Sequence, residues 1–326
     1  MNCHKLEGSG ILKREDVRNV AIIAHVDHGK TTLVDGLLKT SGIFRENQDV
    51  QDRVMDSNDI ERERGITILS KNTAIDYKNH KINIIDTPGH ADFGGEVERV
   101  LKMVNGVVLL VDAFEGPMPQ TKFVLKKSFE LNLPVIVCIN KVDRPEARPL
   151  DVVDEVLDLF IELGADDEIL ECPFVFASAK QGIAALDLDD KMESMDPLFE
   201  TIIKYIPGPE QRDDEPFKLL ISTIDYNEYI GRIGIGKIEQ GIINENDKLV
   251  RVNKLDPDFK ENIKIAQIYE FEGLDRVEVD SSRSGSIVAV TGIEDIEIDY
   301  AIEIDHTVAG RNVFQINVRE AGETAS

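Results

Sequence analysis

The sequence has few cysteines, no apolar run of membrane-spanning length and a shortage of positive charge. Its three cysteines, Cys3, Cys138 and Cys172, are odd in number, and their spacing is far from that of a metal site. Cys138 lies in an apolar stretch, which predicts a reduced, buried side chain. Residues 1–16 lack an apolar core of signal-peptide length, so we expect a soluble, cytoplasmic protein with no membrane partner.

Lysine and arginine number 37 against 62 acidic residues, and the formal net charge is -25 at pH 7. Such a chain does not bind nucleic acid through a general positive field, and no direct sequence-specific DNA binding is expected. Contact with RNA would need a local basic patch or a bound partner. With 326 residues, 42% of them hydrophobic, the chain is long enough for two globular domains.

The most informative stretch is a glycine-rich turn, HVDHGKTT, at residues 25–32. The apolar residues 19–24 predict a buried strand before it, and leucines recurring on one face predict a helix from Lys30 on. In that context the backbone N–H groups of the turn and the positive helix end can bind phosphates. Lys30 would reach the β- and γ-phosphate oxygens, and the Thr31 hydroxyl would hold Mg2+. The alternative is an ordinary strand–turn–helix, since Ala24 stands where the standard pattern has glycine.

A polar, charged segment follows at residues 42–66 and is longer than a usual connection. It is either a solvated surface loop or a switch that is ordered only when a γ-phosphate and Mg2+ are present. Thr67 comes directly after this segment and before a predicted strand. Its hydroxyl is placed to be the second protein ligand of the metal.

Strands are predicted at residues 68–77 and 81–85, with a tight turn at Asn79-His80. The second strand runs into DTPGH. Asp86, at the carboxyl end of a central strand beside the phosphate loop, is placed for a Mg2+-linked carboxylate. Gly89 can bring its N–H close to the γ-phosphate because it has no Cβ. His90 follows and is predicted to position a water molecule for in-line attack, the alternative being a structural or solvated histidine.

Buried strands are predicted at residues 106–112 and 135–139, with a helix at 119–132 between them. The second of these strands ends in Asn140-Lys141-Val142-Asp143, which is predicted to select a base. The Asp143 carboxylate can accept hydrogen bonds from guanine N1–H and the 2-amino group, a donor pair that adenine lacks. Lys141 can lay its aliphatic stem along the base plane. Taken alone, the tetrad could also be a chance polar turn.

The next pattern is an amphipathic helix at residues 151–163, followed by a strand at 173–177 and a helix at 196–205 capped by Asp196. The strand ends in Ser178-Ala179-Lys180, whose backbone N–H groups are placed to meet the guanine 6-oxo group. Strands alternating with helices predict an α/β fold with a mainly parallel sheet. The phosphate site then lies at the carboxyl edge of that sheet.

Proline, glycine and charge replace this periodic pattern at residues 206–216, where a boundary belongs. Short alternating strands separated by glycines follow, and they predict a small β-barrel. We predict strands at residues 217–226, 231–241, 247–252, 263–271 and 286–291, and one or two more within the acidic residues 293–305. No second chemical site is evident in this half.

The motifs occur in the order typical of translational GTPases, and HVDHGKTT, RGITI and DTPGH together make the sequence resemble the TypA (BipA) family. The resemblance covers residues 17–298 and includes DYNEYIGRIGIGKI, which is similar to the second-domain barrel of that family. It implies a P-loop GTPase domain followed by a translation-factor-type barrel. It further implies a GTP hydrolase that binds GTP or GDP with Mg2+ and acts as a ribosome-associated switch.

The resemblance also implies roles for individual residues. Those implied for the phosphates are Asp27, His28, Gly29, Lys30, Thr31, Thr32 and Gly89. Those implied for Mg2+ are Thr31, Thr67 and Asp86. Those implied for guanine are Asn140, Lys141, Asp143, Ser178, Ala179 and Lys180. His90 would act on the attacking water, with Val26 and Ile66 as an apolar gate beside it.

These predictions divide the chain into a tail (1–16), a GTP-binding domain (17–207), a linker (208–216), a barrel (217–305) and a C-terminal extension (306–326). Members of the family continue after the barrel with domains that contact the ribosome, whereas this sequence ends at Ser326 and leaves the family pattern at Asp299. Two other functions stay open at this point. One is a regulatory GTP-binding module that signals to a protein partner, and the other is an ATP-binding scaffold, against which Asp143 argues.

Overall fold

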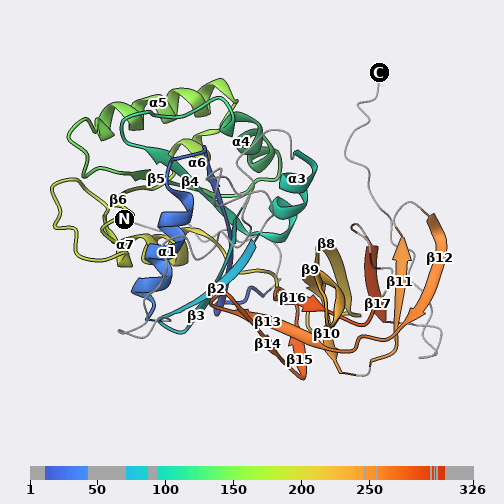
Figure 1. The fold of residues 1–326 in the computed structure, drawn as a ribbon. Coiled ribbons are helices and arrows are strands. Elements are labelled where there is room, and N and C mark those ends of the chain that lie inside the picture. Colours follow the sequence, from blue (N-terminus) through green and yellow to red (C-terminus); the bar gives the residue numbers. More distant parts are fainter. Residues whose placement is uncertain are drawn as a thin grey trace, which may run out of the picture.

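The computed structural model describes residues 12–42, 71–86, 94–245, 247–253, 256–293 and 300–304, together with Ile296 and Ile298. Two large sheets organise these residues, one in each half of the chain (Figure 1). The first has seven strands in the order β2-β3-β1-β4-β5-β6-β7. Its strands are β1 (Val17–Ala24), β2 (Lys71–Tyr77), β3 (His80–Asp86), β4 (Gly106–Asp112), β5 (Val135–Asn140), β6 (Phe174–Ser178) and β7 (Ile183–Ala185).

The five central strands of this sheet are parallel, and β2 and β7 pair antiparallel at its edges. The helices between them are α1 (Lys30–Thr40), α3 (Gly94–Met103), α4 (Thr121–Glu130), α5 (Pro149–Glu162), α6 (Asp167–Leu170) and α7 (Asp196–Tyr205). The mainly parallel α/β fold is confirmed. The central strands are buried on both faces, as their continuous apolar runs predict.

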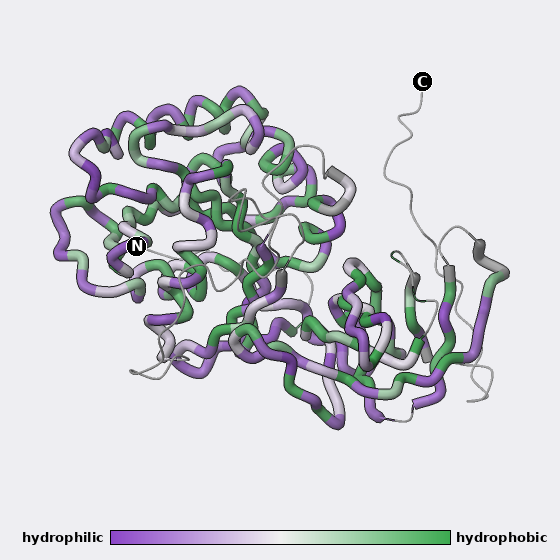
Figure 2. The backbone as a smooth tube through the Cα atoms, viewed as in Figure 1, coloured by the Kyte–Doolittle hydropathy of each residue, from purple (hydrophilic) through white to green (hydrophobic). Residues whose placement is uncertain are grey.

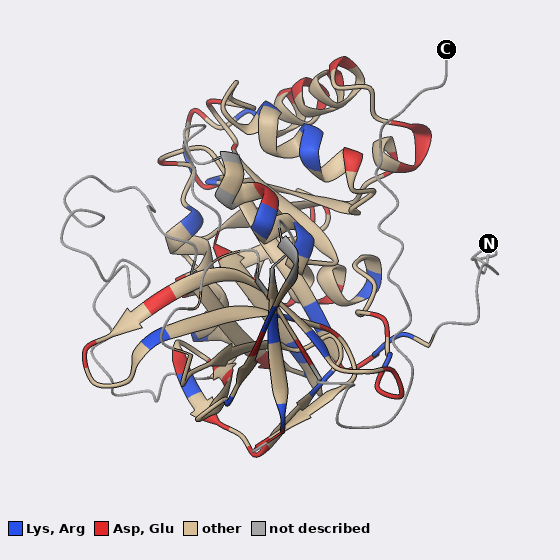
Figure 3. Cartoon of the chain, turned by 90° about the vertical axis from the view of Figure 1, so that its right-hand side faces the viewer, with Lys and Arg blue, Asp and Glu red and all other residues tan. Residues whose placement is uncertain are grey.

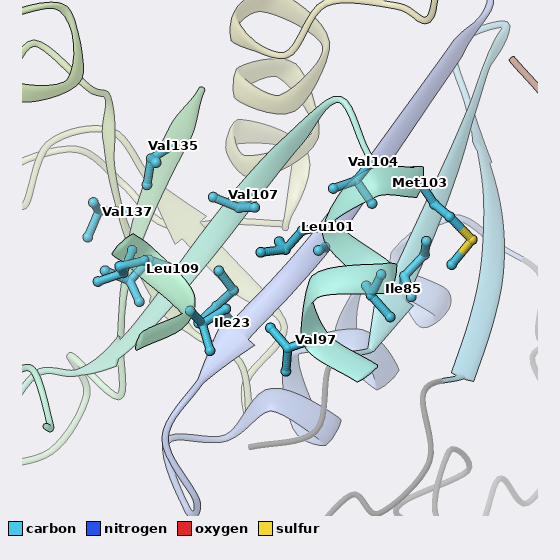
Figure 4. Close-up of a cluster of buried hydrophobic side chains, with 14 of the residues drawn as sticks. Ile23, Ile85, Val97, Leu101, Met103, Val104, Val107, Leu109, Val135 and Val137 are labelled. Atoms are coloured by element: carbon cyan, nitrogen blue, oxygen red, sulfur yellow. The ribbon is translucent and has the colours of Figure 1, made fainter. Parts of the chain in front are cut away.

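Two apolar cores cover the two faces of the parallel sheet. Side chains of α3, α4 and α5 pack on one face against strand residues such as Ile23, Leu109 and Val137. Figure 4 shows Val97 and Leu101 of α3 beside these strand residues. Side chains of α1 and α7 pack on the other face against residues such as Val20 and Ile136. Figure 2 shows the strands as hydrophobic stretches of the chain inside helices whose hydropathy alternates. The helices thereby hold the strand ends, and the loops that follow them, in fixed positions.

The second half is an antiparallel sheet of eight strands in the order β12-β11-β17-β8-β9-β16-β13-β14, with a separate β10–β15 pair. Its strands are β8 (Lys218–Asn227), β9 (Gly231–Gln240), β10 (Ile242–Asn244), β11 (Leu249–Asn253), β12 (Asp256–Ile263), β13 (Ile268–Glu272), β14 (Asp275–Glu278), β15 (Ser281–Arg283), β16 (Ile287–Val290) and β17 (Tyr300–Ile304). It curls around a core of its own. A second half rich in antiparallel strands is confirmed. Among the described residues no strand pair joins β12 to β14, so the closure expected of the predicted barrel is not seen in these pairs.

Some local predictions were wrong. Asp196 does not cap its helix: Met195 occupies that position, and Asp196 and Pro197 form the first turn of α7. The strand predicted at residues 263–271 begins later, as β13 at Ile268, because Ile263 is the last residue of β12 and residues 264–267 belong to no strand. The tight turn predicted at Asn79-His80 lies one residue earlier, at Lys78 and Asn79, which both have positive φ.

Cys138 has no exposed surface, as predicted, and burial raises the pKa of its thiol to about 12. On the amphipathic helix α5, Val152, Val156 and Phe160 are buried, whereas Val153 and Leu157 are only partly covered. Among the described residues, no helix is long and apolar enough to cross a bilayer.

The segment predicted as a linker is held at both sides by hydrogen bonds. The Arg14 N–H donates to the Pro209 carbonyl over 2.8 Å, and the Arg212 N–H donates to Ser284 Oγ over 2.9 Å. Arg14 donates from its guanidinium to the Ser284 carbonyl and to Ser286 Oγ, and its other nitrogen pairs with Asp16 over 2.7 Å. These contacts tie the start of the first half to the β15–β16 turn of the second.

The core between the halves is also continuous. Ile233, Ile235 and Phe271 of the second sheet belong to the same apolar cluster as the α3 side of the first. Lys81 of β3 pairs with Glu270 of β13 over 2.7 Å. On the face shown in Figure 3, Lys and Arg residues are interspersed with Asp and Glu rather than gathered together. This distribution agrees with the absence of a general positive field expected from the composition.

Candidate functional site

The glycine-rich turn connects β1 to α1 as predicted. Gly29 immediately precedes the helix with a φ of 93°, a left-handed conformation that favours glycine. A Cβ on Gly29 would lie 2.6 Å from Asn140 Nδ2, so the close approach of that side chain also requires glycine. Helix α1 begins with no side-chain cap and no acidic residue in its first turn. Its first N–H groups and its positive end are therefore suited to an anion.

Lys30 is nine-tenths buried, and its ammonium lies 2.7 Å from Asp86 Oδ1. Asp86 is the last residue of β3, which pairs with β1 on the side away from β4. The structure thus brings together two of the predicted residues, the phosphate-loop lysine and the carboxylate predicted for Mg2+. Thr31 is half-buried and Thr32 is exposed at the start of α1.

The tetrad Asn140–Asp143 follows β5 and reaches the phosphate loop through its first residue. Asn140 is buried, and its Nδ2 donates to the His28 carbonyl over 2.9 Å. The Ala179 N–H donates to Asn140 Oδ1 over 2.9 Å. Both ends of this amide are therefore bonded to backbone, so Asn140 joins the phosphate loop to the Ser178–Lys180 turn.

Lys141 has a φ of 66°, and its ammonium donates to the Asp27 carbonyl over 2.5 Å. The same nitrogen lies 2.6 Å from Asp112 Oδ2. Asp112 ends β4 and is fully buried. The prediction had treated it only as part of a strand, although the signal was present: a carboxylate closing an apolar strand at the same sheet edge as Asp86.

Asp143 is exposed beside this loop, as is Lys180 at the end of the Ser178–Lys180 turn. Ser178 is buried, and its Oγ has no hydrogen-bond partner among the described residues. Ala179 is buried, and its N–H, one of those predicted to meet the guanine 6-oxo group, donates to Asn140 Oδ1. The structure therefore brings the predicted base-reading residues to one edge, with Asp143 and Lys180 open to solvent.

His28 occupies the buried centre of the phosphate loop. Its Nδ1 lies 3.3 Å from the Leu110 carbonyl, and its Nε2 lies 3.3 Å from Glu115 Oε2. Burial lowers the pKa of His28 against the opposing effects of the Leu110 carbonyl and the nearby carboxylates. The imidazole thus lies between the end of β4 and Glu115 in the segment that follows it. Sequence reasoning missed Glu115, for which no pattern gave a signal.

Four predicted site residues, Ile66, Thr67, Gly89 and His90, lie outside the described residues. The segment predicted to be a switch also lies outside them from residue 43 on. Val26, the other predicted member of the apolar gate, is half-buried in the phosphate loop. The described part of the site thus comprises the phosphate loop, Asp86 and the base-side loops.

Similarity to known families covers both halves of the chain. Residues 15–208 match the family described as "Elongation factor Tu GTP binding domain". Two curated relatives extend the similarity into the second sheet. The large ribosomal subunit assembly factor BipA of Bacillus subtilis is 56% identical over 294 residues, and that of Escherichia coli K12 is 55% identical over 285 residues.

The chain belongs to the family described as elongation factor Tu GTP binding domain, and it is similar to BipA proteins. The matches cover 90% and 87% of the chain but only 48% and 46% of the two BipA proteins. The chain thus spans about half the length of these relatives. The family assignment agrees with the order of the phosphate-loop, DTPGH and base-loop motifs.

Solved structures show the same fold. The structure of translation elongation factor SelB from Methanococcus maripaludis, solved with the GTP analogue GppNHp, superposes with a TM-score of 0.65 at 22% identity. The match covers 88% of this chain and 54% of the SelB chain. A crystal structure of a Thermus thermophilus protein has a TM-score of 0.67 at 16% identity and covers 90% of this chain and 55% of its own. Both likenesses extend across the two sheets.

Proposed function

We propose that this chain binds GTP and GDP, hydrolyses GTP, and acts as a ribosome-associated switch. The observation that carries the proposal is the Asn140 bridge, in which one buried amide bonds to the phosphate loop at His28 and to the Ser178–Lys180 turn at Ala179. The bridge holds a phosphate-binding element and a base-reading element at a fixed separation. That arrangement suits one nucleotide spanning both.

The residues present fit a Mg2+ ion beside the phosphates. Asp86 and Thr31 supply oxygen ligands, which Mg2+ prefers, and Lys30 lies 2.7 Å from Asp86 Oδ1 at the same edge. We propose that Thr31, Asp86 and Thr67 hold the ion. When bound, Mg2+ neutralises charge on the β- and γ-phosphate oxygens. Lys30 would contribute a fixed cation to the same oxygens, with Asp86 retaining its carboxylate for the metal.

Guanine selection rests on Asp143, which is exposed and follows the rigid Asn140–Lys141 pair. We propose that its carboxylate accepts from guanine N1–H and the 2-amino group. Asn140 contributes by positioning, since both its amide ends are already bonded. Lys141 supplies its stem to the base plane, and backbone N–H groups of the turn Ser178-Ala179-Lys180 meet the guanine 6-oxo group.

For hydrolysis we propose that His90 orients the attacking water, with Gly89 at the γ-phosphate and Val26 and Ile66 as the apolar gate. The physical reason is that phosphoryl transfer needs positioning and charge stabilisation more than covalent help. Lys30 and Mg2+ supply charge but do not orient water. A histidine next to the γ-phosphate segment supplies that missing function.

Association with the ribosome is supported by the name of these relatives, large ribosomal subunit assembly factor. The chain spans about half the length of those proteins. We propose that this shared half also acts on the ribosome. A cytoplasmic location follows from that partner. We also propose the domain division given by the sequence, with residues 17–207 as the nucleotide domain and 217–305 as the β domain.

The test is single-turnover GTP hydrolysis with and without ribosomes, for the parent and for His90→Ala. The parent is expected to be slow alone and faster with ribosomes, and the variant to bind GTP normally but to lose the stimulation. Equal stimulation of both proteins would contradict the role of His90. A parent that binds GTP but is never stimulated would favour a regulatory module that signals to another protein.

A further inference from the structure

The segment after β4 contains a buried carboxylate that none of the motifs accounts for. Asp112 has no exposed surface, and its Oδ1 accepts from the N–H groups of Phe114, over 2.8 Å, and Glu115, over 3.3 Å. Its Oδ2 faces the Lys141 ammonium at 2.6 Å. Burial acts to raise the pKa of Asp112, but the Lys141 ammonium and the two backbone N–H groups outweigh it and hold the pKa below its usual value. Asp112 is therefore an anion fixed at the sheet edge.

We propose that Asp112 is a positioning residue that holds the Lys141 side chain as one wall of the base pocket. The inference rests on the proposed GTP binding and deepens it, because it names the group that sets the geometry of the base-stacking lysine. Asp112 would act through Lys141 and would not itself touch the nucleotide.

The lysine is held at both ends. Its backbone follows β5 in a left-handed conformation with a φ of 66°, and Asn140 beside it is paired in register with Asp112. Its ammonium is held by two acceptors, Asp112 Oδ2 and the Asp27 carbonyl of the phosphate loop. The aliphatic stem of Lys141 therefore extends from the end of β5 to the phosphate loop.

Holding the stem in place before the base arrives favours binding. A lysine side chain loses rotamer freedom when it is ordered, and here that loss occurs on folding rather than on nucleotide binding. Without Asp112 the ammonium would retain only the neutral Asp27 carbonyl as its described acceptor. The stem would then sample several rotamers, and binding would have to order it.

The carboxylate, rather than the lysine, is the fixed member of the pair. Two backbone N–H groups orient Asp112 from within its own loop, whereas Lys141 reaches it along a flexible stem. A second cation near Asp112 is Arg144, whose Nη1 is 3.7 Å away and whose side chain is 49% exposed. At that distance and exposure it contributes little, which makes it a matched control.

The stem contacts the plane of a base and not its edge, so it does not read base identity. Loss of Asp112 is therefore expected to lower the binding affinities for GTP and GDP by the same factor. The preference for GTP over ATP, which depends on Asp143, is expected to stay unchanged. This pattern differs from that of general destabilisation, which lowers the folded fraction without coupling to Lys141.

The experiment is a double-mutant cycle on nucleotide affinity, measured by calorimetry with Mg2+ on protein whose folding is verified by circular dichroism. Asp112→Asn keeps the side-chain shape and an oxygen acceptor for the backbone but removes the charge. It is expected to weaken GTP and GDP about tenfold each, about 1.4 kcal/mol. Asp112→Asn added to Lys141→Ala is expected to cause no further loss, and Arg144→Ala is expected to match the parent within about twofold.

Lys141→Met provides a second variant if Asp112→Asn does not fold. It keeps an aliphatic stem but removes the ammonium that Asp112 holds, so it is expected to weaken GTP and GDP by a similar factor. An affinity equal to the parent's in Lys141→Met or Asp112→Asn would overturn the inference, as would fully multiplicative effects in the cycle. These results leave the proposed function intact, whereas a parent that binds no GTP contradicts the proposed function and the inference with it.

Discussion

Asn140 is the residue whose removal tests the geometry of the site most sharply. Asn140→Ala removes two hydrogen bonds of 2.9 Å, one given by Nδ2 to the His28 carbonyl and one received by Oδ1 from the Ala179 N–H. The carbonyl and the N–H would stay buried without these partners. Each such group costs about 1–3 kcal/mol, so the free energy of unfolding is expected to fall by about 2–6 kcal/mol.

The measurement is urea denaturation of nucleotide-free protein, prepared with a chelator and followed by circular dichroism. Asn140→Asp is the matched variant, since its carboxylate still accepts from the Ala179 N–H but cannot donate to the His28 carbonyl. It is expected to lose stability as well, because two oxygens would face each other. If Asn140 served only to contact guanine, nucleotide-free Asn140→Ala would be as stable as the parent. That result would refute the Asn140 bridge between the phosphate loop and the Ser178–Lys180 turn.

Three further predictions follow from the contacts. Lys30→Ala is expected to lower calorimetric GTP affinity by about 100-fold, since it removes the fixed cation at the phosphates, while Lys39→Ala at the exposed end of α1 should bind as the parent does. Asp143→Asn is expected to prefer xanthosine triphosphate over GTP in competition, and an unchanged preference for GTP would contradict the base-reading role of Asp143. The Arg14 guanidinium holds the pKa of Asp16 at about 2, so its stabilisation is complete above pH 3.8 and lost as pH falls through 2. Asp16→Asn should therefore cost about 1 kcal/mol at pH 7, after solvent screening, and flatten acid denaturation in that range.

The sequence predicted the parallel half well because its signals there are local. β4 occupies residues 106–112 as predicted, since an unbroken apolar run between polar ends has one reasonable interpretation. α7 covers Asp196–Tyr205 as predicted, but its cap was assigned one residue late. Asp and Pro both favour the first turn of a helix, so the pattern alone does not separate the cap from the residue after it.

The antiparallel half was harder because its strand ends depend on distant partners. The alternation from Ile263 to Phe271 looks continuous, yet it is interrupted where the Ala266 N–H donates to the Thr291 carbonyl. β15, with the sequence SSR, has no apolar pattern and forms through its pairing with β10. Thr291 and β10 lie far along the chain from Ala266 and β15, so the local sequence pattern predicts neither contact.

The site shows the same division. Residues that touch the nucleotide in the proposal, such as Lys30 and Asp143, carry recognisable motifs. Asp112 and Glu115, which lie against Lys141 and His28, are single acids whose role depends on which loops the sheet brings together. Their positions became evident only from the pairing of β4 with β5 and from the burial of His28.

The central claim is that the phosphate loop and the base loops form one guanine-nucleotide site. Calorimetric titration of the nucleotide-free protein with GTP and with ATP, both with Mg2+, tests it most directly. We expect one nucleotide per chain and a preference for GTP of about 1,000-fold or more, because Asp143 has no donor pair to accept from in adenine. Equal binding of ATP and GTP, or no binding of either, would contradict the account.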